Sequence, residues 1–308
     1  MITIQNQNFG VEIELTGITR EKGAKVISQY FGGTETGRLQ DGYDTRTAKD
    51  SKGRTWKCSR DISITPETRG RRLDEGRTAG DHRCEVVTPI LQYEDLEDLQ
   101  QIVRKLREAG AIANSSCGIH VHVDGANHTP DSLTRLINFA VGRQDLFYEA
   151  LEIGDRGDRW CKKINSALLN AMKHDSVRTK ESMERIWYSA VNDGYNRGID
   201  HAHYNSTRYH GVNLHAFFTK GTVEFRLFNG TTHAGKIKAY VQFCLAMSAW
   251  AINAKDNLHF MKSAHYQDKA QRGKLMLGVL KNRLGMRGPE YKTARLHLTA
   301  AFTDQAAA

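Results

Sequence analysis

A nine-residue segment, CGIHVHVDG at 117–125, restricts the folds that this chain can adopt. A β-strand places alternate side chains on opposite faces. The isoleucine and the two valines of the segment would therefore share one face, and His120 and His122 would share the other. The alternation predicts a strand with an apolar face and an imidazole-bearing face.

Other segments of the chain show the same alternation of polar and apolar residues. Each pair of polar residues is separated by one apolar residue, so both members occupy one face of an expected strand. Because antiparallel sheets often have one solvated face, a wet surface is the alternative explanation for any single row. The rows are Glu12 and Glu14 around Ile13, Asp61 and Ser63 around Ile62, Glu85 between Cys84 and Val86, Asn213 and His215 around Leu214, and Glu224 and Arg226 around Phe225.

The residue types in these rows indicate metal binding. Wet faces favour lysine, threonine and serine, whereas these rows hold glutamate, histidine, asparagine and arginine and no lysine. Two carboxylates about 4 Å apart repel by roughly 4 kcal/mol at an effective dielectric constant of 20, so converging acids require raised pKa values or a cation. Carboxylate oxygens suit Mg²⁺ or Mn²⁺, and an imidazole favours Mn²⁺ or Zn²⁺. The predicted ligands to two or more metals are Glu12, Glu14, Glu85, His120 and Glu224.

The remaining pattern predicts helices between the strands. Thr129-Pro130-Asp131 supplies a hydroxyl N-cap, a proline at the first position and an acid in the first turn, so a helix should begin there and run to about Glu152. The polar, glycine-bearing stretch 66–81 lacks periodicity and predicts a mobile loop. Further helices are expected at 21–31, 93–109, 160–174, 178–192 and 235–254, and strands at 55–64, 82–90, 209–217 and 221–229, the last two joined as a hairpin through Thr219-Lys220-Gly221.

Composition restricts the class of protein further. The 308 residues contain no apolar run near the roughly 18 residues of a membrane span, and MITIQNQNFG lacks the pattern of a signal peptide. Five cysteines form no CxxC pair, which fits reduced thiols, so we expect a cytoplasmic protein. The formal net charge is +9, of which +6 arises from Lys255 to the end, so the partner of this tail could be nucleic acid, a nucleotide or an acidic substrate.

Five of these short motifs occur in an order that resembles the putative amidoligase family, related to glutamine synthetase and glutamate–cysteine ligase. They are FGVEIE, the Asp61-Ile62-Ser63 segment, CEVVTP, GIHVHV and VEFRLFN, and the resemblance covers about residues 8–245. It implies an α+β fold, with a curved antiparallel sheet like a half-open barrel and helices on its convex side. We accordingly expect a catalytic domain over 1–254 and a basic, mostly helical extension over 255–308.

The resemblance also implies ATP-dependent, ADP-forming ligation of a carboxylate to an amine or ammonia through an acyl phosphate. By motif position the residues that would hold Mg²⁺ or Mn²⁺ are again the five predicted ligands. Arg226 would stabilise the transferring phosphoryl group, because its guanidinium can bind two oxygens at once. Catalytic roles are also predicted for Asp61 and His122, and contacts to ATP for Arg208, Asn213, Ser63 and His215.

Several alternatives stay open at this stage. His122 could be a structural histidine, and Arg208 an ordinary surface arginine. A metal-dependent phosphodiesterase or nuclease, or a non-catalytic nucleic-acid-binding protein, would also account for the charge and the polar rows. The chain contains no GxxxxGK[ST], HExxH or strand-linked GxGxxG motif. The acid could be a peptide, an amino acid, a cell-wall component or a modified nucleotide, and a glutamine amidotransferase partner could deliver ammonia.

Overall fold

The computed structural model describes residues 1–174, 177, 179–191, 198–255 and 268–303. These residues form two compact units, each built from separate stretches of the chain. We call them the N-terminal unit, which comprises Asn8–Val121 and Phe228–Tyr240, and the C-terminal unit, which comprises Met1–Gln7, His122–Leu227 and Val241–Ala308. Two strands, β8 and β10, carry residues of both units.

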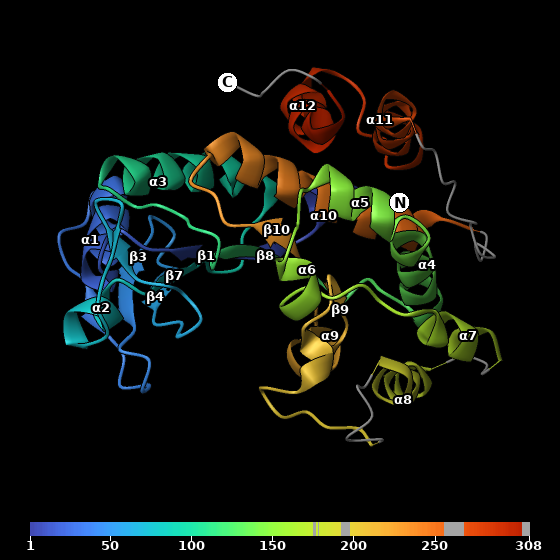
Figure 1. The fold of residues 1–308 in the computed structure, drawn as a ribbon, viewed down its shortest axis with the longest axis horizontal. Coiled ribbons are helices and arrows are strands. Elements are labelled where there is room, and N and C mark those ends of the chain that lie inside the picture. The colour runs from blue at the N-terminus through green and yellow to red at the C-terminus, as the bar shows by residue number, and fades with distance from the viewer. Residues whose placement is uncertain (175–176, 178, 192–197, 256–267, 304–308) are drawn as a thin grey trace. The chain divides into compact units, whose positions relative to one another are not determined.

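The strands of Figure 1 belong to one large sheet and one small hairpin. The main sheet has the order β2-β3-β4-β7-β1-β8-β10-β9 and does not close into a barrel, and β5 pairs with β6 separately. The pairs β1·β7, β2·β3, β3·β4, β4·β7 and β9·β10 are antiparallel. The strands are β1 (Phe9–Leu15), β2 (Gly37–Arg38), β3 (Arg46–Lys49), β4 (Thr55–Ser59), β5 (Glu67–Thr68), β6 (Arg71–Arg72), β7 (Cys84–Val87), β8 (Gly118–Asp124), β9 (Val212–Asn213) and β10 (Thr222–Asn229).

Helices account for about half of the rest of the described chain. The predicted α+β class with an antiparallel sheet is confirmed, while the glutamine-synthetase-like half-barrel stays a prediction. The helices are α1 (Arg20–Tyr30), α2 (Arg77–Asp81), α3 (Leu96–Glu108), α4 (Pro130–Val141), α5 (Gln144–Ala150), α6 (Arg156–Arg159), α7 (Ser166–His174), α8 (Lys180–Val191), α9 (His215–Lys220), α10 (Ala234–Asn253), α11 (Lys269–Gly278) and α12 (Lys292–Thr299).

In the N-terminal unit, alternation along the strands separates an apolar face from a polar one. Val11, Ile13 and Leu15 of β1 are each 1% exposed, and α1 packs on the neighbouring strands β3, β4 and β7 and also contacts α3. A Cβ at Gly23 of α1 would lie 3.1 Å from Cys58 Sγ, so glycine at this position allows the helix its close approach to the sheet. This packing leaves the opposite face of β1 to Glu12 and Glu14.

The C-terminal unit is mainly helical. Thr129 caps α4 as predicted, its hydroxyl accepting a hydrogen bond from the Ser132 amide. The single helix expected from there is instead two, α4 and α5, separated at Gly142 and Arg143. Phe147 of α5 packs edge-on against Phe243 of α10, with ring centroids 5.2 Å apart.

The C-terminal stretch 268–303 belongs to the C-terminal unit. Arg272 of α11 pairs with Glu149 of α5 at 2.8 Å, and apolar side chains of the stretch, including Met276, Leu280 and Leu298, are buried. The predicted division of the chain at 254/255 stays a prediction, as does any role of the basic tail in nucleic-acid binding. Part of that tail, 256–267 and 304–308, lies outside the described residues.

Two further expectations about local structure were wrong. The strand expected over 55–64 ends at Ser59, because Asp61 Oδ1 accepts a hydrogen bond from the Ser63 amide at 2.7 Å and closes a turn. The expected loop over 66–81 contains the β5·β6 hairpin and α2. Arg69 and Gly70 both have positive φ (48° and 72°), which suits the right-handed twist of a tight hairpin.

The arms of the hairpin expected over 209–229 do pair antiparallel, as β9 and β10, but the expected turn was wrong, because α9 lies between them. Asn213 Oδ1 accepts a hydrogen bond from the His215 amide at 2.8 Å, which turns the chain from β9 directly into α9. Gly221 then ends the helix in the left-handed conformation, with φ of 74°. His215 is therefore the first residue of a helix and does not share a strand face with Asn213.

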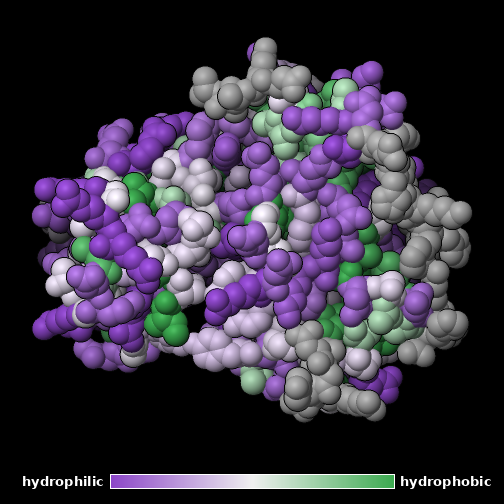
Figure 2. All heavy atoms as spheres, viewed as in Figure 1, coloured by the Kyte–Doolittle hydropathy of each residue, from purple (hydrophilic) through white to green (hydrophobic). Residues whose placement is uncertain are grey.

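Hydrophilic residues predominate on the face of the molecule drawn in Figure 2, where hydrophobic residues form only small, separate groups. Among the described helices, none combines the length and the apolar character needed to cross a membrane.

Candidate functional site

The polar face of the N-terminal unit brings acidic side chains together. Glu14 of β1 and Glu85 of β7 are direct partners in the antiparallel register, and Ser59 of β4 is paired with Glu85 on its other side. Directly opposed residues have Cβ atoms about 4.5–5.5 Å apart, and two like charges in this position destabilise a sheet. The register therefore creates a concentration of negative charge at the centre of the unit's sheet.

His120 of β8 contacts both glutamates of β1. Its Nδ1 lies 3.0 Å from Glu12 Oε2, and its Nε2 lies 3.6 Å from Glu14 Oε1. The other Glu14 oxygen accepts a hydrogen bond from the Gly118 amide at 2.6 Å. His120 is 2% exposed and Glu14 4%, so these groups interact where water screens charge poorly.

Asp61 joins this cluster from the turn that follows β4. Ligand atoms of Glu14, Asp61 and Glu85 lie within 4.8 Å of one another, and the same holds for Glu12, Glu85 and His120. The two groups share Glu85, and we call the five residues together the acidic cluster. The structure thus brings together four of the five predicted metal ligands, together with Asp61. Ser63 donates its backbone amide to Asp61, so it is tied to the turn that positions this carboxylate.

The donor atoms of the acidic cluster fit divalent cations. Four carboxylates and one imidazole match the oxygen-rich sets that hold Mg²⁺ and Mn²⁺, and two groups with a shared carboxylate would suit a pair of ions. His120, Glu12 and Glu85 could hold one ion, and Glu14, Asp61 and Glu85 a second. Cations at these positions would offset the repulsion among these acids, of which Glu14 is buried and the other three are partly exposed.

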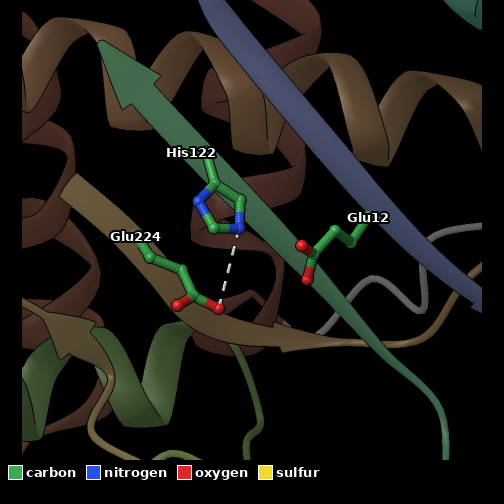
Figure 3. Close-up of side chains that lie close together, drawn as sticks. All are labelled: Glu12, His122 and Glu224. Carbon is green, nitrogen blue, oxygen red and sulfur yellow. Dashed lines mark ion pairs between the residues drawn. The ribbon is translucent and has the colours of Figure 1, made fainter. Parts of the chain in front are cut away.

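A second polar group lies in the C-terminal unit around Glu224 of β10. Its Oε1 accepts a hydrogen bond from Arg226 Nη1 at 2.5 Å, and its Oε2 accepts one from Asn213 Nδ2 at 2.6 Å. His122 Nε2 lies 3.8 Å from Glu224 Oε1, and Figure 3 shows this imidazole facing the carboxylate. We call Glu224, Arg226, Asn213 and His122 the arginine–glutamate group. All four residues are buried.

This arrangement bears on the predicted role of Glu224. The carboxylate is already neutralised by Arg226, the residue with which it shares a strand face, as the alternation predicts. The metal-ligand role predicted for Glu224 stays a prediction. Asn213 is the direct partner of Glu224 in the β9·β10 register, which explains their contact. His122 Nδ1 also contacts the Thr222 hydroxyl at 2.9 Å.

His215 and Arg208 lie beside this group without belonging to it. The Tyr188 hydroxyl lies 2.6 Å from His215 Nδ1, and burial lowers the pKa of His215 to about 4, with Arg208 and His201 adding to the effect. Arg208 donates to the His203 carbonyl at 2.6 Å and stacks 5.6 Å above the Tyr209 ring. The predicted ATP contacts of His215 and Arg208 stay predictions.

Two aromatic residues near these groups were not predicted from the sequence. Tyr188 comes from α8, far along the chain from His215, and burial raises its pKa. The Tyr209 ring contacts two arginines, because it is also 5.9 Å from the Arg226 guanidinium. Only the three-dimensional arrangement identifies them. The position of Tyr209 immediately after Arg208, in the stretch TRYHGVN, is the one hint that the sequence offers.

Fold and site together define an α+β protein whose antiparallel sheet carries a cluster of carboxylates able to hold cations. The family described as "putative amidoligase enzyme" matches residues 5–248, about four-fifths of the chain. The chain belongs to this family, as the order of its motifs predicts, and the family is one of ligase-type enzymes. A comparison with curated proteins finds no match.

Proposed function

We propose that this protein is an ATP- and metal-dependent ligase that joins a carboxylate to an amine or to ammonia through an acyl phosphate. The observation that carries the proposal is the acidic cluster, with two donor groups that share Glu85 in a chain of the amidoligase family. Phosphoryl transfer depends mainly on alignment and charge neutralisation, which such a cluster could provide through bound cations. Mg²⁺ or Mn²⁺ would neutralise the phosphate oxygens of ATP and align them for transfer.

The proposed reaction has two steps. An oxygen of the substrate carboxylate attacks the γ-phosphorus of ATP, and the bond from that phosphorus to the ADP oxygen breaks. The amine nitrogen then attacks the acyl carbon, inorganic phosphate leaves, and the nitrogen loses a proton. The net products are an amide, ADP and phosphate. This balance requires no oxidant, reductant or additional cofactor.

The proposal gives the side chains separate tasks. Glu12, Glu14, Glu85 and His120 bind the cations, and Asp61 either joins them or orients the incoming amine. Arg226 binds the transferring phosphoryl group, with its guanidinium held in place by Glu224 and by the Trp160 carbonyl at 3.3 Å. The remaining predicted contacts to ATP and substrate are those of His122, Asn213, His215, Arg208 and Ser63.

The test is to incubate the full chain with ATP, Mg²⁺ or Mn²⁺, and pools of carboxylates and amines, and to identify the nucleotide product. We expect ADP and phosphate to appear only when both substrates are present. Glu12→Gln and Arg226→Lys should each reduce turnover by at least about a hundredfold, since a group that stabilises developing charge is worth that much in mutagenesis. Glu108→Gln, at an exposed glutamate paired with Lys105 on α3, is the matched control and should retain full activity.

Two outcomes of this experiment contradict the proposal. Release of AMP and pyrophosphate would exclude the acyl-phosphate route. Full turnover in both Glu12→Gln and Arg226→Lys would remove these residues from the mechanism. Circular dichroism spectra of the variants show whether a loss of activity reflects a loss of folding instead.

The acidic cluster also favours a second candidate, a metal-dependent phosphodiesterase. Two cations that share a carboxylate could activate water and stabilise the leaving oxygen of a phosphodiester. Cleavage of plasmid DNA or RNA with Mn²⁺ and without ATP, lost in Glu85→Gln, would support this candidate over the ligase.

A further inference from the structure

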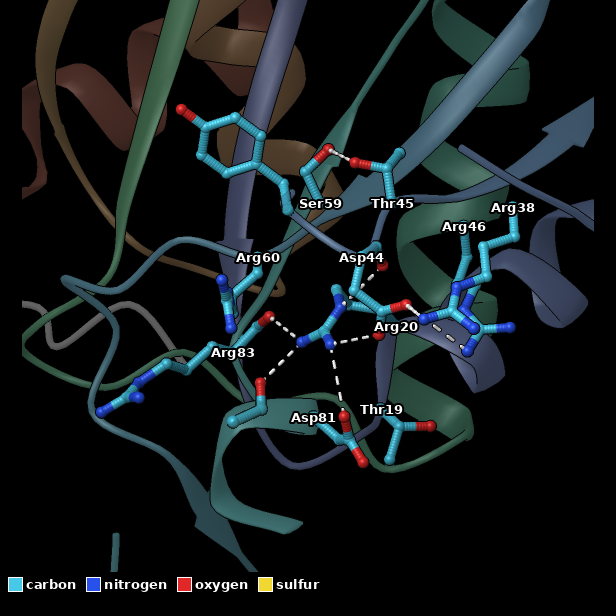
Figure 4. A network of polar contacts seen from close by, with 12 residues as sticks. Thr19, Arg20, Arg38, Asp44, Thr45, Arg46, Ser59, Arg60, Asp81 and Arg83 are labelled. Atoms are coloured by element: carbon cyan, nitrogen blue, oxygen red, sulfur yellow. Dashed lines mark hydrogen bonds and ion pairs between the residues drawn. The ribbon is translucent and has the colours of Figure 1, made fainter. Parts of the chain in front are cut away.

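A second polar site in the N-terminal unit is a pocket of about 580 Å³ that is rich in arginine. Its lining residues are charged apart from one threonine and two glycines, and no aromatic or aliphatic side chain contributes. Three of the lining residues are acids, Glu21, Asp44 and Asp81. The six arginines of the pocket are Arg20, Arg38, Arg46, Arg60, Arg77 and Arg83, most of them shown in Figure 4.

Arg20 and Asp44 form the fixed framework of this pocket. The Arg20 guanidinium donates to Asp44 Oδ2 at 2.7 Å and to the carbonyls of Gly80 and Arg83 at 2.6 and 3.1 Å, and its side chain is only 4% exposed. The Arg20 guanidinium also lowers the pKa of Asp44, so this carboxylate stays charged. The pair therefore neutralises itself and ties α1 to the loops around it.

The other arginines have much less negative charge around them. Arg38 and Arg46 converge on the same Asp44 oxygen, Oδ1, at 2.7 and 3.7 Å, as Figure 4 shows. Arg60 donates to the Gly42 carbonyl, a neutral group. Within the described residues, the Arg77 guanidinium makes no hydrogen bond or ion pair. Arg83 pairs with Glu75, just outside the lining, at 2.7 Å. After these two pairs neutralise themselves, four guanidiniums remain against two lining carboxylates, one of which already contacts Arg20.

We propose that this pocket binds a small, hydrophilic anion with two or more phosphate or carboxylate groups. Guanidinium groups bind both kinds of oxyanion through paired hydrogen bonds. The pocket is much larger than one phosphate, and several arginines around one volume favour a ligand with more than one anionic group. The absence of apolar lining among the described residues argues against a ligand that needs a hydrophobic contact. No residue of this pocket belongs to the acidic cluster, so the inference stands independently of the ligase reaction.

The experiment measures anion binding to the full chain by calorimetry, in buffer freed of divalent metals on a chelating resin. The probes are inorganic pyrophosphate, citrate and a ten-nucleotide single-stranded DNA. We expect saturable, one-to-one binding of pyrophosphate, citrate or both, and the two probes distinguish phosphate from carboxylate recognition. Arg46→Gln and Arg77→Gln should each weaken binding about tenfold, the usual effect of losing one charge-assisted hydrogen bond.

Two matched variants make this test specific. Arg104→Gln removes an arginine of α3 that pairs with Glu97 outside the pocket, and it should leave the affinity unchanged. Glu85→Gln alters the acidic cluster and should also leave metal-free anion binding intact. Thermal melting of each variant shows whether the fold is preserved.

The following outcomes would overturn the inference. The first is that neither small anion binds saturably, and the second is that Arg46→Gln, Arg77→Gln and Arg104→Gln weaken binding equally. The third is that Glu85→Gln loses pyrophosphate binding. The fourth is that the oligonucleotide binds and neither small anion competes with it. The last result would instead identify a nucleic-acid surface. Because no turnover is measured, failure of the ligase proposal would not affect the result.

Discussion

At the scale of single residues, Glu85 occupies the most constrained position in the acidic cluster. It lies opposite Glu14 in the sheet register and belongs to both donor groups. A residue shared by two groups should matter more for cation binding than one that belongs to a single group. Its charge should also cost stability when no cation is present.

The first prediction concerns Glu85→Gln. Loss of this carboxylate should weaken Mn²⁺ binding by at least about tenfold. Even residues that only hydrogen-bond to a metal ligand contribute this much to metal affinity. In metal-free buffer the same change should raise the free energy of unfolding by about 1 kcal/mol, since it relieves repulsion between carboxylates. Titration with Mn²⁺ followed by electron paramagnetic resonance, and urea unfolding, measure the two effects.

Glu108→Gln serves as the control for this prediction, because it removes an exposed carboxylate outside the cluster. Equal Mn²⁺ affinity in Glu85→Gln and in the wild type would show that the acids do not form a cation site.

The second prediction at this scale follows from the lowered pKa of His215, which is about 4 in the folded chain. An unfolded histidine has a pKa near 6.5, so between these values the unfolded state binds more protons. The stability that neutral His215 contributes is complete above pH 6.5 and is lost as the pH falls toward 4. Between pH 7 and pH 5 this loss should be about 2 kcal/mol.

His215→Gln should therefore reduce the difference in unfolding free energy between pH 7 and pH 5, measured by urea titration. Replacement of exposed His233 by glutamine provides the comparison for removing an imidazole elsewhere. If the difference in unfolding free energy between pH 7 and pH 5 is the same in His215→Gln as in the wild type, the assignment of this pH dependence to His215 is wrong.

At the scale of secondary-structure elements, the contact of α1 with the sheet depends on Gly23. A Cβ there would approach Cys58 Sγ to 3.1 Å and Cys84 Sγ to 3.5 Å. By contrast, a Cβ at Gly278, at the end of α11, would have no neighbouring atom of the described residues within 4 Å. The two helical glycines therefore separate the effect of packing from that of helix propensity.

The third prediction compares alanine at these two positions. Gly278→Ala should raise the free energy of unfolding by up to about 1 kcal/mol, the difference in helix propensity between the two residues. Gly23→Ala should give a free energy of unfolding at least about 1 kcal/mol below that gain, because its methyl group overpacks the interface between α1 and the sheet. Adding Cys58→Ala to Gly23→Ala should restore part of the lost free energy of unfolding. Equal gains in stability from Gly23→Ala and Gly278→Ala would contradict the argument.

At the scale of the whole molecule, the basic C-terminal stretch is part of a folded unit. Fully burying a large apolar side chain contributes about 1.5–3 kcal/mol. Several such side chains together are comparable with the net stability of about 5–15 kcal/mol of a typical domain. The buried apolar residues of this stretch include Met276, Val279, Leu280, Leu284, Met286, Leu298 and Phe302.

The fourth prediction is that a chain truncated after Ala254 does not fold into a stable C-terminal unit. Its near-ultraviolet circular dichroism should lack the signal of packed aromatic residues, and its unfolding should lose cooperativity. Arg272→Gln, which removes the partly exposed ion pair with Glu149, should cost less than about 1 kcal/mol. A truncated chain with wild-type cooperativity would instead support an independent catalytic domain over 1–254.

The sequence by itself determined which residues share a face of each regular strand. Strand geometry is local, so alternation was sufficient to pair Glu12 with Glu14, and Glu224 with Arg226. The order of the short motifs was also sufficient to indicate the family. Helix starts such as Thr129 were readable for the same reason, because capping depends on neighbouring residues.

Only the tertiary structure decided which residues meet across the chain. The register of β1 and β7 places Glu85 opposite Glu14, and side-chain hydrogen bonds at Asp61 and Asn213 replace expected strands by a turn and a helix. The arginine pocket likewise combines residues from several segments that carry no shared motif. Such contacts depend on long-range packing and on competition between side-chain and backbone hydrogen bonds, and neither is encoded in local periodicity.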